Sequence, residues 1–225
     1  MSTNTPKKRP NPRAEARRAA EKRRRLLLIA GGVAVVLLAV GIAVASVGES
    51  SSRITVADVA GDVEVTGEPL PLFEGDPTND PAIGMVAPIV EGESFAGDGR
   101  EVGGASGPQL ITFMASWCPA CDREMPDLTA WLDDGRLPDE VDLVAVSTFL
   151  DEGRPNWPPD EWFDGFGYTG PVMVDDASSS ISEAFGLSGT PFWVAVDADG
   201  EVVWRTSGLI PMEQLDEVAA QIAAS

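Results

Sequence analysis

The 225-residue chain contains no histidine, only two cysteines, and no lysine beyond Lys22. A structural zinc site usually takes four ligands from Cys and His, so two cysteines without histidine exclude such a site. The missing histidine also excludes a copper chaperone that pairs two cysteines with a distant histidine. No internal repeat is present. The sequence therefore predicts neither a metal site nor any other cofactor.

The charged residues are divided unevenly along the chain. The whole chain has 16 basic and 36 acidic residues and a net charge of -20. Residues 1–25 alone hold ten basic and two acidic residues, a net charge of +8, which leaves -28 on the remainder. A surface this acidic repels nucleic acid, so nucleic-acid binding is excluded. A salty exterior, which screens charges over about 8–10 Å, would make the self-repulsion of this acidic surface tolerable. A genome that prefers Arg to Lys would explain the missing lysines equally well.

Residues 26–48 form a run without charged side chains, dominated by Leu, Val, Ala and Ile. A membrane-spanning helix needs about 20 such residues. We therefore predict a transmembrane helix, or uncleaved signal anchor, over 26–48. The positive-inside rule places residues 1–25 in the cytoplasm and residues 49–225 on the outer side of the cell membrane. A cleaved signal peptide is the alternative, because Ala43-Val44-Ala45 has the form of a cleavage site, and it leads to the same compartment.

The exported part divides into two regions of different composition. Residues 49–83 are rich in Gly, Pro and acidic side chains, which predicts an acidic spacer, and 54–59 alternates as a strand would. Residues 84–225 alternate between strands and helices. Strands are predicted at 110–114, 141–146, 171–174, 192–196 and 201–204, and helices from 119, at 159–166, at 178–185 and at 211–222. This order predicts an α/β domain, with a mixed central sheet flanked by helices.

Cys118 and Cys121 lie where a predicted buried strand turns into a helix. A thiol in the first turn of a helix lies near unpaired N–H groups, which can lower its pKa from about 8.5 into the range 3.5–7.5. The spacing of three returns Cys121 to the same helix face. We therefore predict a redox-active disulfide in which Cys118 is the catalytic nucleophile and Cys121 the resolving thiol.

A purely structural disulfide between these cysteines is disfavoured. The stabilisation from a disulfide grows with the length of the loop it closes, and this loop is very short. The pattern therefore favours redox chemistry over a structural role.

The active-site motif resembles that of a known family. Residues 113–121, followed by Glu124 and Pro126, are similar to the motif of membrane-tethered thioredoxin-like proteins of the TlpA, ResA and CcmG group, within the redoxin/AhpC-TSA-like superfamily. Residues 84–97 resemble the N-terminal hairpin of that group, and 189–191 resemble its cis-proline loop. The resemblance covers about residues 84–223.

The resemblance implies a thioredoxin-like fold with an N-terminal hairpin extension, and roles for individual residues. Glu124 is implied to be catalytic, by tuning the pKa values of the thiols and assisting proton transfer. The alternative is that this carboxylate, in the first turns of a helix, only complements the helix dipole. Thr190 and Pro191, joined by a cis bond opposite Cys118, are implied to bind substrate. Trp117 either contacts the client or only packs against the domain.

The implied activity is that of an exported thiol-disulfide oxidoreductase. Its partners would be client proteins with disulfides or thiols, in one branch during cytochrome c maturation, and a membrane electron donor that restores the dithiol. Two alternatives stay open. The dithiol could oxidise client thiols instead, because the direction depends on how strongly the Cys118 thiolate is stabilised. It could also belong to a tethered thiol-binding module without turnover.

Overall fold

The structure is a computed structural model, and it describes residues 53–225. The predicted cytoplasmic segment at 1–25 and the predicted transmembrane helix at 26–48 lie outside the described residues. Among the helices of residues 53–225, none combines the length and the apolar character needed to cross a membrane. Residues Ile54–Ser225 form one compact unit.

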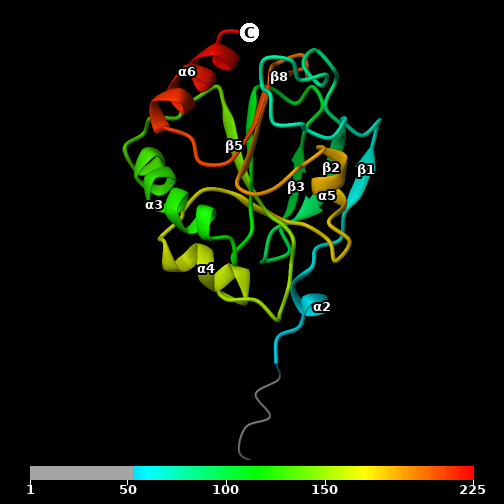
Figure 1. The fold of residues 1–225 in the computed structure, drawn as a ribbon, viewed down its shortest axis with the longest axis vertical. Coiled ribbons are helices and arrows are strands. Elements are labelled where there is room, and N and C mark those ends of the chain that lie inside the picture. The colour runs from blue at the N-terminus through cyan, green and yellow to red at the C-terminus, as the bar shows by residue number, and fades with distance from the viewer. Residues whose placement is uncertain (1–52) are drawn as a thin grey trace, which may run out of the picture. The chain divides into compact units, whose positions relative to one another are not determined.

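One mixed sheet organises this unit (Figure 1). Its eight strands are β1 (Glu64–Thr66), β2 (Ile89–Glu93), β3 (Gly99–Val102), β4 (Gln109–Met114), β5 (Asp142–Ser147), β6 (Val172–Val174), β7 (Phe192–Val196) and β8 (Val202–Ser207). The helices are α2 (Val56–Val59), α3 (Pro119–Asp133), α4 (Pro159–Gly165), α5 (Ser180–Ala184) and α6 (Met212–Ala223).

The strand order is β1-β2-β6-β5-β4-β7-β8, with β3 paired to β2. Strands β4, β5 and β6 are parallel, whereas β7 and β8 run antiparallel to their neighbours. The α/β class with a mixed sheet is confirmed. The predicted elements from residue 110 onward are all present, with ends shifted by a few residues.

Strands β4 and β7, at the centre of the sheet, carry no charged side chain and are buried at every position. The sheet is therefore covered on both faces there. Helices α3, α4 and α6 pack on one face, around side chains such as Leu128 and Trp193 (Figure 1). Helix α5 and residues 70–87 cover the other face, around side chains such as Phe113 and Phe185. The carboxyl end of β4 leads, through residues 115–118, into α3 on the first of these faces.

Residues 54–83 pack against the domain, although composition predicted a spacer there. Strand β1 pairs with β2, and Leu70, Phe73 and Ala82 are buried in the core. Composition concealed this role because the few apolar residues are separated by prolines and acidic residues. Gly186, with φ +65°, permits the close approach of the segment, since a Cβ there would lie 2.3 Å from the backbone oxygen of Pro71.

The alternating stretch 54–59 contains the helix α2 instead of a strand. The side chain of Asp58 accepts hydrogen bonds from the backbone N–H (2.9 Å) and the hydroxyl (2.7 Å) of Thr55. These bonds close a first helical turn, which periodicity over six residues could not reveal.

The hairpin implied by the resemblance is present as β2 and β3. Its strands pair antiparallel, and Glu93 on β2 pairs with Val174 on β6, so the hairpin extends the central sheet. Of the residues that carried the resemblance, 84–88 precede the first strand, which begins at Ile89, and Phe95 and Gly97 lie in the turn between the two strands.

Candidate active site

Cys118 lies at the junction between β4 and α3. Its backbone N–H donates to the oxygen of Ala115 (2.9 Å), which closes a tight turn after the strand, and Pro119 begins the helix. The Sγ of Cys118 caps that helix by accepting a hydrogen bond from the backbone N–H of Cys121 (3.3 Å). Both thiols are free; Cys118 retains 6% exposure and Cys121 is fully buried. Only Cys118 is therefore open to an incoming disulfide.

The loop before β7 meets Cys118 from the opposite side. The Thr190–Pro191 peptide bond is cis, as the resemblance implied. The Cys118 thiol donates to the backbone oxygen of Thr190 (3.2 Å). Pairing of β4 with β7, which sets Phe113 opposite Phe192, brings these distant segments together. The sheet register thus places a backbone edge beside the Sγ of Cys118.

The two thiols have opposite pKa shifts. Burial raises the pKa of Cys118, but hydrogen bonds from the Cys121 and Thr190 side chains and from the backbone of Cys121 and Ala120 lower it, and its pKa lies below the ordinary value. Burial raises the pKa of Cys121 well above its usual range, and its hydrogen bond with Cys118 adds to the shift. The thiolate is therefore favoured at Cys118 and disfavoured at Cys121.

Glu124 is buried in α3, one turn beyond Cys121. Its Oε1 accepts from the indole N–H of Trp193 (3.2 Å) and from the backbone N–H of Ile210 (3.2 Å). Its Oε2 has no hydrogen-bond partner among residues 53–225. Burial raises the pKa of Glu124 to about 7, against the lowering effect of these two hydrogen bonds. A carboxyl group with this pKa can accept and release a proton near neutral pH.

Trp117 is half-buried beside Cys118 and is held by the loop between β5 and α4. Its indole N–H donates to the backbone oxygen of Phe149 (2.8 Å), and the guanidinium of Arg154 lies 4.3 Å from the centre of its ring. Phe149 has φ 51°, an unusual conformation for an aromatic residue, and this conformation accompanies the bond from its carbonyl to Trp117. Trp117 is thus fixed in place, with part of its surface open.

The loop 149–158 is the part of the site that the sequence did not reveal. The side chain of Asn156 donates to the backbone oxygen of Ser116 (2.8 Å), within the active-site turn. The indole N–H of Trp162, on α4, donates to Asp122 (2.7 Å), the residue after Cys121. The only sequence signal was the run Trp-Pro-Pro at 157–159, which indicates a conformationally restricted loop but does not indicate its contacts.

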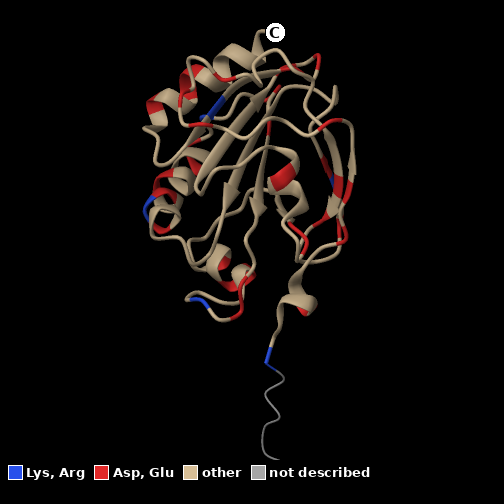
Figure 2. Ribbon diagram, turned by 45° about the vertical axis from the view of Figure 1, so that its right-hand side comes forward, with Lys and Arg blue, Asp and Glu red and all other residues tan. Residues whose placement is uncertain are grey.

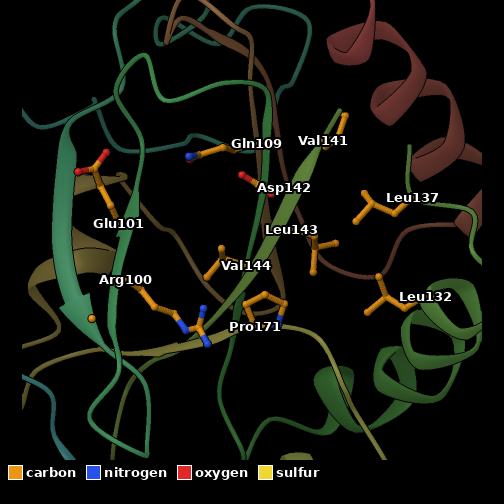
Figure 3. Close-up of a pocket in the computed structure, with 11 residues that line it drawn as sticks. Arg100, Glu101, Gln109, Leu132, Leu137, Val141, Asp142, Leu143, Val144 and Pro171 are labelled. Atoms are coloured by element: carbon orange, nitrogen blue, oxygen red, sulfur yellow. The ribbon is translucent and has the colours of Figure 1, made fainter. Parts of the chain in front are cut away.

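A cavity without a cysteine lies at the end of the sheet opposite to Cys118 (Figure 3). This cavity of about 320 Å³ is lined by the beginnings of β4 and β5 and by residues such as Arg100, Leu132 and Leu137. In Figure 3 the guanidinium of Arg100 points toward Pro171, whereas Glu101 points away. The thiol chemistry is therefore confined to the other end of the sheet.

Comparison with known proteins identifies the family. A profile described as Redoxin matches residues 85–222. The chain belongs to the Redoxin family. This membership confirms the resemblance drawn from the active-site motif.

The relatives of this Redoxin chain carry names of redox proteins. Thiol-disulfide oxidoreductase ResA of Geobacillus kaustophilus is 24% identical over 107 residues, which cover 48% of this chain and 58% of the relative. Thiol:disulfide interchange protein DsbE of Pseudomonas aeruginosa is 21% identical over 156 residues, covering 69% and 74%. This chain thus spans little more than half the length of its ResA relatives.

The fold is also that of a solved relative. A thiol:disulfide interchange protein of the thioredoxin family from Chlorobium tepidum superposes with a TM-score of 0.51 at 21% identity, over 67% of this chain and 99% of the other. The predicted thioredoxin-like fold is confirmed for the described domain.

Proposed function

We propose that this Redoxin protein is an extracytoplasmic thiol-disulfide oxidoreductase that reduces disulfides in client proteins. The observation that carries the proposal is the asymmetry of the dithiol. The accessible Cys118 has a lowered pKa, and the buried Cys121, one helical turn away, has a raised pKa. This is the arrangement required for one thiol to attack and the other to resolve. The names of the ResA and DsbE relatives support the same activity.

The reaction proceeds in two exchanges. The Cys118 thiolate attacks one sulfur of the client disulfide, a mixed disulfide forms, and the other client sulfur leaves as a thiolate that takes a proton from water. Cys121 then loses its proton and attacks the Sγ of Cys118. The mixed disulfide breaks, the second client thiolate is released, and a Cys118–Cys121 disulfide remains. Two electrons have passed to the client, and a membrane electron donor returns the domain to the dithiol form.

Glu124 is proposed as the group that takes the proton of Cys121. The raised pKa of Cys121 makes its deprotonation the difficult step. Glu124 lies three residues further along α3, on the same face, with Oε2 unpartnered in the described part of the chain. A carboxyl group of pKa about 7 matches this role at neutral pH.

Thr190, Pro191 and Trp117 are proposed to hold the client. The backbone beside Pro191 forms an edge next to Cys118 against which an extended segment can lie. Trp117 offers a rigid half-exposed ring, fixed by Phe149. An extended client would therefore present its disulfide to Cys118 between these two elements.

The proposed direction is reduction, because among the described residues no cation contributes to the lowered pKa of Cys118. Every group that lowers its pKa is a hydrogen-bonding group of a neutral residue, namely Ala120, Cys121 and Thr190. A strong thiol oxidant owes its high potential to a strongly stabilised reduced form.

The chain is further proposed to be a single-pass membrane protein, with residues 1–25 in the cytoplasm and 26–48 as the anchor. The support is the run of uncharged residues and the +8 charge before it. The described domain would then lie outside the membrane.

Two measurements test the proposed function. The full chain should catalyse reduction of insulin disulfides by dithiothreitol, and Cys121→Ser should accumulate a mixed disulfide with insulin that Cys118→Ser does not form. No turnover, with mixed disulfide still trapped, would instead support a thiol-binding module. A reduction potential near the value of about -270 mV of thioredoxin supports the reductase, and one near -120 mV contradicts it.

A further inference from the structure

A cavity of about 460 Å³ opens beside the first turn of α3. Its walls come from that turn, from the loop 149–158 and from α4. They include the side chains of Asp122, Asn156, Trp157, Glu161, Trp162 and Phe166. We refer to it as the α3–α4 cavity.

The α3–α4 cavity is built onto the turn that carries the dithiol. Asp122 directly follows Cys121, and its Oδ1 accepts from the indole N–H of Trp162 (2.7 Å). Asn156 joins the cavity wall to the active-site turn through its bond to the oxygen of Ser116 (2.8 Å). When a client disulfide reaches Cys118, a client side chain close to that disulfide would therefore lie beside the α3–α4 cavity.

The lining combines aromatic rings with carboxylates. The rings of Trp162 and Phe166 lie 5.3 Å apart at 78°, and Trp157 adds a third ring. Asp122 and Glu161 supply negative charge, and among the described residues that line the cavity none is Lys or Arg. Aromatic faces attract cations, and a carboxylate adds to this attraction.

Cation binding on an indole already occurs once at this loop. The guanidinium of Arg154 lies over the ring of Trp117, and Arg154 does not line the α3–α4 cavity. Its positive charge is therefore not placed against the carboxylates of that cavity. Carboxylates also dominate the charged positions drawn on the domain in Figure 2, so a basic client is attracted over a longer range.

We propose that the α3–α4 cavity binds a Lys or Arg side chain of the client, close to the disulfide that Cys118 attacks. The inference rests on the proposed function for its biological meaning and deepens it, because it assigns a class of client: segments with a basic residue near the cystine.

Binding is tested separately from turnover. The full chain is titrated by calorimetry with three peptides that share one sequence, have serine in place of both cysteines, and carry Lys, norleucine or Glu at the variable position. We expect the Lys peptide to bind about 5- to 10-fold more tightly than the norleucine peptide, and the Glu peptide to bind weakest. The cysteine-containing peptides should show the same order in kcat/KM.

Two variants locate the effect. Glu161→Gln and Trp157→Leu should each reduce the ratio of Lys to norleucine affinity by at least about twofold. Asp164→Asn removes the same charge from α4 outside the cavity and should leave the ratio nearly unchanged. Using a ratio cancels any general loss of active protein.

Equal affinity for the Lys and norleucine peptides, or tighter binding of norleucine, would overturn the proposal. A Lys preference that survives in both cavity variants would overturn it as well. If neither cysteine-containing peptide is reduced while the Lys preference in binding persists, the proposed function fails and the cavity assignment stands.

Discussion

Asp80 and Glu124 are buried carboxyl groups on opposite faces of one sheet. Asp80 lies in the segment 70–87 and accepts from the Nε of Arg205 (2.8 Å), with which it forms a fully buried ion pair. Glu124 lies in α3, where its Oε1 accepts from neutral donors and its Oε2 lacks a partner within the described residues. Burial alone raises both pKa values, but the bonds of Arg205 hold the pKa of Asp80 below its usual range, and that of Glu124 is raised to about 7.

The difference shows how the partner of a buried carboxyl group sets the direction of its pKa shift. A buried carboxylate paired with a guanidinium stays charged, and this ion pair joins the segment 70–87 to β8. A buried carboxyl without a cation titrates near neutral pH, and Glu124 does so one helical turn from Cys121, whose proton it is proposed to accept. Substitutions at Arg205 and Glu124 each remove one side of this contrast.

The largest effect on stability is expected when Arg205 is replaced. Arg205→Met leaves the charge of Asp80 buried without its partner, which should lower the free energy of unfolding by about 3–5 kcal/mol. Urea denaturation measures this loss. The matched control is Arg136→Met, because Arg136 pairs with Asp216 in a half-buried position at the surface, and its loss should be far smaller. Similar losses for the two variants would show that the Asp80 pair does not fasten the segment.

The largest effect on rate, after loss of either cysteine, is expected at Glu124. Glu124→Gln keeps the volume and removes the proton acceptor, which should lower kcat by about 10²-fold. The wild-type kcat should rise with pH through about 7, as Glu124 ionises, and this inflection should be absent in the variant. Asp133→Asn, an exposed change on the same helix, should keep the wild-type profile. An unchanged inflection in Glu124→Gln would assign it to another group.

The two carboxyl groups should also change stability with pH in opposite directions. Asp80 has a lowered pKa, so its contribution is complete above its unfolded value of about 3.9 and is lost as the pH falls through its folded pKa. Glu124 has a raised pKa, so stability should fall as the pH rises from about 4.3 to about 7. Unfolding free energies measured across this range should show a smaller decline in Glu124→Gln, and part of it should remain because burial also raises the pKa of Asp175. A decline of undiminished size there would contradict the linkage to Glu124.

The smallest effect is expected at Asp127, which contributes to the raised pKa of Glu124 through its negative charge. Asp127→Asn should shift the inflection in kcat slightly toward lower pH, with little change in the plateau. A shift toward higher pH would contradict the assigned direction.

Much of the site could be predicted because its chemistry is local in sequence. Cys118, Pro119 and Cys121 are placed by one strand-to-helix junction, and a pattern of nine residues is enough to predict it. The register that brings Thr190 to Cys118 was implied only by the family resemblance, because a contact across 72 residues leaves no local signal.

Other features depend on pairings that no local pattern carries. Asp80 looked like one acidic residue among many, and only the structure reveals its partner, 125 positions away. The hold of loop 149–158 on Trp117 depends on the backbone oxygen of Phe149, which any residue would provide. The apolar residues of 54–83 are too sparse for periodicity to reveal that they pack.

The most direct test of the ordered dithiol is alkylation of the reduced full chain by iodoacetamide over a range of pH, with the modified peptides identified by mass spectrometry. We expect Cys118 to react first, with a midpoint below the ordinary pKa of a cysteine thiol, while Cys121 stays unmodified in the folded protein. Equal labelling of the two thiols, or earlier labelling of Cys121, would contradict it.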